Sequence, residues 1–177
     1  MTTPNTFYFG SGSPYAWKVW LALEYKQLPY EAKRMTFDGG ELKSPEFTAI
    51  NPRQKVPAIV DNGFAMYESS AILDYLEDRY PQSGAPLWPG DVHARAVARR
   101  RAAEAVAYVD PLNDKLLTAI LVPADQAPDA AAIDAAKKAY AEELARIEDW
   151  FTHDYAAGPQ LSGADFTLYP YLAFLGR

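Results

Sequence analysis

The sequence predicts a protein of two domains, a mixed α/β domain over residues 1–80 and an all-helical domain over residues 92–177. Three observations carry this prediction. Short runs of β-forming residues alternate with helical runs as far as residue 80. A segment rich in Pro, Gly and Ser, residues 81–91, reads as a linker. The remainder is rich in Ala and has helical spacing, without an alternating strand pattern.

The first half is expected to follow the order β-α-β-α-β-β-α, a small mixed sheet covered by helices. Its predicted elements are a strand at 6–9, a helix at 14–24, a strand at 30–35, a helix at 45–50, a hairpin over 56–67 and a helix from 69 or 70 to 79. The first helix has Ser13 as a favourable N-cap and Pro14 at its first position. The hairpin prediction depends on Asn62 and Gly63, a pair typical of two-residue hairpin turns.

The second half is expected to hold three helices. They are predicted over 92–121, over 129–155 and from 161–165 onward. The first is one long helix or a helix bent near Pro111. Apolar residues recur at helical spacing along the second helix, from Ile133 to Phe151. Ser162 and Asp165 stand in the relation of a capping box, which marks the start of the third helix.

Composition excludes several function classes. The mean hydropathy is -0.25, and no apolar run is long enough to span a bilayer, so we expect a cytoplasmic protein without a membrane partner. The net charge of -6 argues against a general phosphate-backbone footprint, so no nucleic-acid partner is expected. The basic run 99–101 is interpreted as a solvated helix face.

The chain has no cysteine and two histidines, His93 and His153. Disulfides, thiolate metal sites and a cysteine nucleophile from this chain are therefore excluded. The presence of only two histidines also argues against a Ser-His-Asp triad and against a multi-histidine metal site. We expect no metal.

Pro57 stands where the first strand of the hairpin begins, and proline cannot donate a hydrogen bond into a sheet. Two interpretations remain open. A cis bond between Val56 and Pro57 would turn the backbone N–H and C=O of Val56 outward, toward an extended peptide ligand. Alternatively, Pro57 marks a plain transition from loop to strand.

Four segments resemble the landmark segments of cytosolic glutathione transferases, in the family's order and at about its spacing. They are SPYAWKVWLAL at 13–23, NPRQKVPAI at 51–59, ESSAILDYL at 68–76 and LSGADFTLYP at 161–170. The resemblance implies a thioredoxin-like first domain, an all-α second domain, a homodimer, and glutathione bound as co-substrate mainly by the first domain.

By the same resemblance, Ser13 is the catalytic residue. It stands where serine-type members, such as the tau and zeta classes, carry the hydroxyl that touches the glutathione sulfur. Tyrosine-type members place their phenol on the first strand, where this chain has Phe9. Ser11 and Tyr8 are weaker alternatives, and strand alternation directs Tyr8 to the other face of the sheet.

The resemblance also implies a set of glutathione-binding residues. Val56, followed by Pro57, matches the residue whose backbone pairs with the cysteinyl part of glutathione. Glu68 and Ser69 match the pair that holds the γ-glutamyl end, and Lys55 matches a position that meets the glycyl carboxylate. Lys43 is a further candidate for that carboxylate, although an ordinary surface lysine explains it equally well.

The function implied is a glutathione transferase, in which the thiolate of glutathione attacks a small hydrophobic electrophile, by conjugation, isomerisation or dehalogenation. Tyr15 and Tyr108 are candidates to line the electrophile pocket. The alternative is a non-catalytic binding or scaffold protein of the same fold. Two departures from the family pattern are Trp20, where an arginine is common, and a helical domain that we expect to be one or two helices short.

Overall fold

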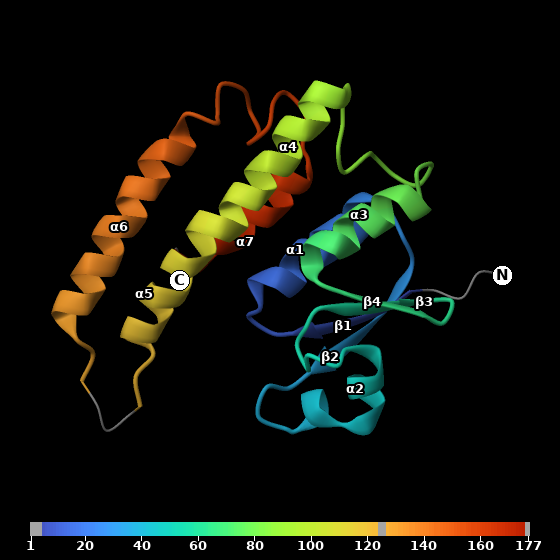
Figure 1. Cartoon of the computed structure of the whole chain (residues 1–177), viewed down its shortest axis with the longest axis horizontal. Coiled ribbons are helices and arrows are strands. Elements are labelled where there is room, and N and C mark those ends of the chain that lie inside the picture. Colours follow the sequence, from blue (N-terminus) through green and yellow to red (C-terminus); the bar gives the residue numbers. More distant parts are fainter. Residues whose placement is uncertain (1–4, 124–126, 176–177) are drawn as a thin grey trace. The chain divides into compact units, whose positions relative to one another are not determined.

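The computed structural model describes residues 5–123 and 127–175, and the chain divides into two units, residues 1–87 and 88–177 (Figure 1). Each unit has its own architecture, α/β in the first and helical in the second. The division falls inside the predicted linker 81–91, and the bounds of the domains themselves stay a prediction. In the part of the chain described, no helix combines the length and apolar character needed to cross a bilayer.

The first unit is built on a four-stranded mixed sheet with the order β2-β1-β3-β4. Strands β1 and β2 are parallel, whereas β3 is antiparallel to both β1 and β4. In chain order its elements are β1 (Asn5–Gly10), α1 (Pro14–Tyr25), β2 (Tyr30–Met35), the short 3-10 helix η1 (Glu41–Lys43), α2 (Pro45–Ile50), β3 (Ala58–Asp61), β4 (Phe64–Tyr67) and α3 (Ser69–Arg79). The predicted order of strands and helices is confirmed.

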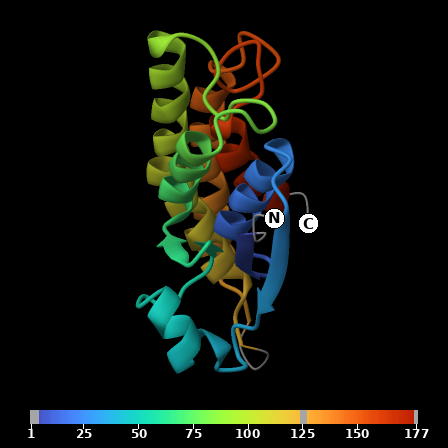
Figure 2. The same ribbon diagram turned by 90° about the vertical axis from the view of Figure 1, so that its right-hand side faces the viewer.

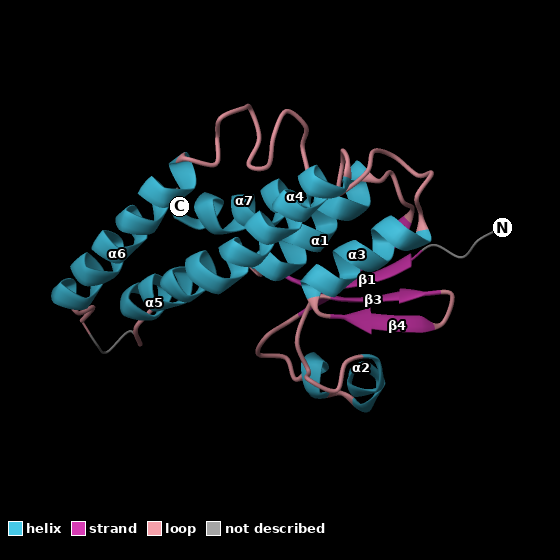
Figure 3. Cartoon of the chain, turned by 45° about the horizontal axis from the view of Figure 1, so that its top comes forward, coloured by secondary structure: helices cyan, strands magenta, loops and turns pink. Residues whose placement is uncertain are grey.

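The sheet is covered on both faces. Helices α1 and α3 lie on one side of it and α2 on the other (Figures 2 and 3). Side chains of β1 alternate accordingly. Phe7 is fully buried and stacks on Phe9 at 5.6 Å between ring centroids, whereas Tyr8 packs on Phe47 of α2 at 5.5 Å. The expected opposite direction of Tyr8 is therefore confirmed.

The second unit contains α4 (Val92–Glu104), a π-helical turn η2 (Ala105–Val109), α5 (Asp110–Ile120), α6 (Ala130–Glu148) and α7 (Gly163–Leu175). The wide turn η2 lies just before Pro111, where the sequence left open a bend. Proline lacks the N–H that continues an α-helical ladder, and a π-helical turn accommodates that loss.

The predicted end of the second long helix is wrong. Helix α6 ends at Glu148, not at residue 155, and Phe151 lies outside it and is exposed. The following segment is held by tertiary contacts. The Arg101 guanidinium donates to the carbonyl oxygens of Trp150 (2.9 Å) and Ala156. These bonds fix a non-helical path after the end of α6.

The capping box at the start of α7 is confirmed. The backbone N–H of Ser162 donates to the Asp165 carboxylate at 2.9 Å, and the Ala164 N–H donates to the Ser162 hydroxyl at 3.2 Å. The other carboxylate oxygen of Asp165 accepts from the Ala156 N–H at 2.7 Å. One side chain thus caps the helix and anchors the preceding loop.

Candidate functional site

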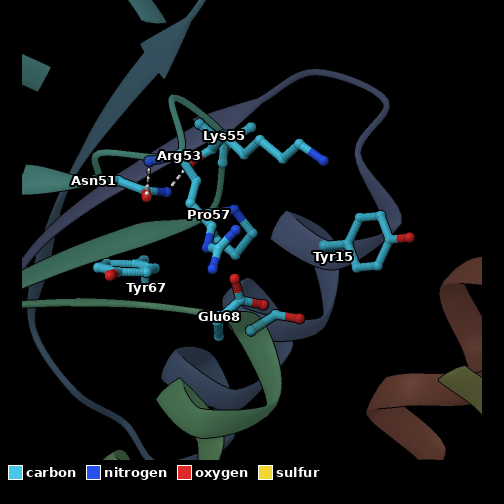
Figure 4. A pocket seen from close by; sticks show the side chains of 9 residues that line it. Tyr15, Asn51, Arg53, Lys55, Pro57, Tyr67 and Glu68 are labelled. Carbon is cyan, nitrogen blue, oxygen red and sulfur yellow. Dashed lines mark hydrogen bonds between the residues drawn. The ribbon is translucent and has the colours of Figure 1, made fainter. Parts of the chain in front are cut away.

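A cavity of about 530 Å³ opens in the first unit where three segments of the chain meet (Figure 4). These are the first turn of α1, the loop from α2 to β3, and the junction of β4 with α3. Its lining residues are Tyr15, Asn51, Arg53, Lys55, Val56, Pro57, Tyr67, Glu68 and Ser69. The cavity therefore combines two cations, one carboxylate and a helix N-terminus.

The loop between α2 and β3 is fixed from inside by Asn51. Its buried side chain donates from Nδ2 to the Lys55 carbonyl (2.6 Å) and accepts the Arg53 N–H at Oδ1 (3.0 Å), as the dashed lines in Figure 4 show. The backbone of Gln54, at a φ of 56°, donates to the Asn51 carbonyl at 2.9 Å. Because this network lies on the inner side of the loop, the side chains of Arg53 and Lys55 stay exposed.

The bond between Val56 and Pro57 is cis, the first of the two alternatives left open by the sequence. Val56 lies just before β3 and lines the cavity. Within the described residues, neither its backbone N–H nor its C=O has a hydrogen-bond partner. One donor and one acceptor are thus available to an extended peptide, as at the edge of a sheet.

The junction of β4 with α3 presents a helix N-terminus to the cavity. Glu68 is the N-cap of α3, but no side chain caps the helix. Ser69, the first helical residue, is buried and lines the cavity. Uncapped N–H groups at a helix start attract a carboxylate, because they are unpaired donors at the positive end of the helix dipole.

The structure brings together five of the seven residues predicted for the site, namely Lys55, Val56, Pro57, Glu68 and Ser69. Ser13 and Lys43 are not among the lining residues. Ser13 is half-buried at the N-cap of α1, and its hydroxyl accepts the Ala16 N–H at 3.2 Å. Lys43 is exposed at the end of η1.

Three lining residues had no predicted role: Asn51, Arg53 and Tyr67. Asn51 and Arg53 belong to the same motif as Lys55, and a second cation two residues before Lys55 was an available signal. Tyr15, predicted as a candidate for the electrophile pocket, lines this cavity. Of the weaker catalytic alternatives, Ser11 is exposed in a turn, and Tyr8 packs on Phe47.

Comparison with known proteins identifies the family of the chain. Residues 7–84 match the family model for the glutathione S-transferase N-terminal domain, and residues 112–177 match that for the C-terminal domain. The chain is 30% identical to glutathione S-transferase A of Pleuronectes platessa, over 100% of this chain and 80% of that protein. The chain belongs to the glutathione S-transferase family.

Solved glutathione S-transferases have the same fold. A transferase from the Antarctic clam Laternula elliptica superposes with a TM-score of 0.86 at 31% identity, covering 98% of this chain and 78% of that one. A Burkholderia graminis transferase, solved with two glutathione molecules per subunit, superposes with a TM-score of 0.83 at 28% identity, covering 97% and 72%. The predicted glutathione transferase fold and function are confirmed at the level of the family.

Proposed function

We propose that the cavity binds glutathione and that the Ser13 hydroxyl stabilises its thiolate for attack on a small hydrophobic electrophile. The observation that carries the proposal is the set of charges around the cavity. Glutathione is an extended peptide with two carboxylates, one ammonium group and one thiol. The cavity offers two cations and a helix N-terminus for the carboxylates, Glu68 for the ammonium group, and the unpaired backbone of Val56 for the peptide.

Each part of glutathione has a proposed partner. Lys55 binds the glycyl carboxylate, with Lys43 as a second candidate. The backbone of Val56, positioned by Pro57, pairs with the cysteinyl residue. Glu68 binds the γ-glutamyl ammonium, and the hydroxyl and N–H of Ser69 bind the γ-glutamyl carboxylate. Two glutathione molecules bound to the subunit of the Burkholderia graminis relative support this ligand.

The role of Ser13 agrees with its hydrogen bond in the unliganded chain. Its oxygen accepts the Ala16 N–H, so its own O–H remains available to donate to sulfur. A thiol of pKa about 8.5 is only about 3% ionised near pH 7, and each unit by which the pKa falls increases the thiolate nearly tenfold. The thiolate then forms a bond to the electrophilic carbon, the leaving group departs with its electron pair, and no covalent enzyme intermediate forms.

The test compares two cap residues. Ser13→Ala and Ser44→Ala each remove an N-cap that accepts a backbone N–H at 3.2 Å, but Ser13 caps α1, whose first turn lines the cavity through Tyr15, whereas Ser44 caps α2. We expect both to lose about 1 kcal/mol of stability. Only Ser13→Ala should raise the pKa in the pH–rate profile for glutathione with an aromatic electrophile, by about one unit, so that its rate near pH 7 falls about tenfold.

The outcomes separate the alternatives. An unchanged pH–rate profile in Ser13→Ala would remove Ser13 from the mechanism. Glutathione binding without turnover in the native chain would favour a binding or scaffold protein, and no binding would overturn the proposal. The homodimer and the cytoplasmic location are further parts of the proposal, and a monomer in sedimentation at micromolar concentration would contradict the first.

A further inference from the structure

The guanidinium of Arg53 lines the cavity, and it is one of the two cations offered to the glutathione carboxylates, but the proposed function gives it no partner of its own. Among the described residues its side chain has no hydrogen bond or ion pair, and only its backbone N–H is bonded, to Asn51. In Figure 4 the side chain extends from the loop toward Glu68 at the start of α3, whereas Lys55 extends in a different direction. The two cations of the loop therefore point in different directions.

The backbone that carries Arg53 is held in place by the Asn51 side chain. Asn51 bonds the N–H of Arg53 and the carbonyl of Lys55, so both backbone positions are fixed before any ligand arrives. A charged side chain on a fixed backbone loses less freedom on binding than one on a loose loop.

The γ-glutamyl group proposed to bind at the α3 end of the cavity carries both an ammonium group and a carboxylate. Glu68 favours the γ-glutamyl ammonium, but it repels the carboxylate on the same carbon atom. The N-terminus of α3 offsets part of this repulsion, since its dipole amounts to about half a charge. An arginine fork can supply the remaining positive charge, and it matches the geometry of a carboxylate through two parallel N–H donors.

We propose that Arg53 binds the α-carboxylate of the γ-glutamyl group, opposite the N-terminus of α3. Arg53 and Glu68 then recognise the two opposite charges on one carbon atom, which makes the site selective for a γ-glutamyl thiol over a thiol peptide that lacks either charge. This inference rests on the proposed binding of glutathione.

The test compares two charge-removing cavity variants and a control variant, each with glutathione and two analogues of it, and binding is measured by calorimetry. Arg53→Met and Lys55→Met each remove one cation from the cavity, and Arg34→Met removes an exposed arginine of β2 outside it. One analogue, γ-aminobutyryl-cysteinyl-glycine, lacks only the α-carboxylate. The other, glutathione amidated at glycine, lacks only the glycyl carboxylate.

We expect Arg53→Met to weaken the binding of glutathione and of the glycyl amide about 10-fold, a typical effect of losing one charged hydrogen-bonded pair. It should leave the γ-aminobutyryl analogue within about twofold of the native value. Lys55→Met should show the reverse selectivity, and Arg34→Met should bind all three ligands like the native chain. Arg53→Lys, which keeps the charge but loses the fork, should lie between native and Arg53→Met.

Unchanged glutathione affinity in Arg53→Met, or an equal loss for glutathione and the γ-aminobutyryl analogue, would overturn the inference and leave the proposed function standing. Failure of the native chain to bind glutathione would overturn the proposed function, and this inference with it. Thermal unfolding of Arg53→Met identifies a variant that fails to fold, and in that case Arg53→Lys decides between the outcomes.

Discussion

Glu68 has a backbone conformation that a residue with a side chain rarely adopts, with φ of 69° and ψ of 104°. Such a conformation costs on the order of 1–3 kcal/mol and persists where the surroundings impose it. Glu68 lies at the N-cap of α3 without capping it, so local helix stability does not account for a glutamate there. The proposed binding of the γ-glutamyl ammonium group does.

Replacement of Glu68 by glycine should have opposite effects on the stability of the protein and on glutathione binding. Glu68→Gly should increase the free energy of unfolding by about 1 kcal/mol, because glycine tolerates a positive φ. The same variant should weaken glutathione binding about tenfold or more, since a charged hydrogen bond is lost. Glu68→Gln keeps the strained backbone and should weaken binding without the gain in stability. Urea unfolding and ligand titration measure both, and a less stable Glu68→Gly would contradict the strain argument.

Asn51 is predicted to position the binding loop without touching the reacting atoms. Asn51→Ala removes two hydrogen bonds of a buried side chain and should lower the free energy of unfolding by about 2 kcal/mol. Because the loop carries Arg53 and Lys55, we expect KM for glutathione to rise while kcat stays near the native value. Ser44→Ala, which loses the N-cap of α2 but keeps both Asn51 side-chain hydrogen bonds, provides the control, and an equal rise of its KM would point to general loosening.

At the scale of elements, the sequence predicted those helix and strand bounds, caps and turns that depend on neighbouring residues. The bounds of β2 and α2 are as expected, Ser13 and Ser162 cap helices, and Asn62-Gly63 turns the hairpin. The end of α6 was not predictable in this way, because it depends on Arg101, which is 49 residues from Trp150 in sequence.

The residues of the candidate site likewise include some that the sequence predicted and others that it did not. Lys55, Val56 and Glu68 were predicted because they belong to motifs of the family. Arg53 was missed although the sequence shows a cation two residues before Lys55, because a sequence pattern does not show that its side chain extends toward Glu68.

The junction of the sheet with α3 depends on one buried carboxylate. Asp61, the last residue of β3, accepts hydrogen bonds from the hydroxyls of Tyr75 and Tyr80, each at 2.7 Å, and from the Asn62 amide. Arg79 lies 3.5 Å away. Burial by itself acts to raise the pKa of Asp61, but the hydrogen bonds and Arg79 together hold that pKa below its ordinary value.

A lowered pKa in the folded state predicts a specific loss of stability in acid. The contribution of Asp61 is fully present above the unfolded pKa of about 3.9 and is lost as the pH falls through the lower pKa of the folded state. Asp61→Asn should therefore lower the free energy of unfolding by about 2 kcal/mol near pH 7, and its difference from the native chain should shrink below about pH 4. Urea unfolding across this range is the measurement, and a difference independent of pH would contradict the assignment.

At the scale of the whole molecule, the absence of cysteine from all 177 residues has a defined meaning. It excludes cysteine-type glutathione transferases and the dithiol chemistry of thioredoxins and glutaredoxins, although the first unit has their kind of fold. The sulfur of the proposed reaction is supplied by the substrate. In the same proposal, the protein contributes cations, a helix N-terminus and a hydroxyl donor around it.

Alkylation tests this division of roles between protein and substrate. Treatment with iodoacetamide at neutral pH, followed by removal of the reagent, should leave the conjugation rate unchanged, because the chain has no thiolate to react. Added together with glutathione, the reagent should instead stop conjugation as it consumes the only thiol present. A loss of activity after the first treatment would contradict this expectation, because it would show that the reagent had modified a side chain other than cysteine that the protein needs for activity. A sample alkylated with saturating glutathione product in the cavity would then show whether that residue lies inside the site.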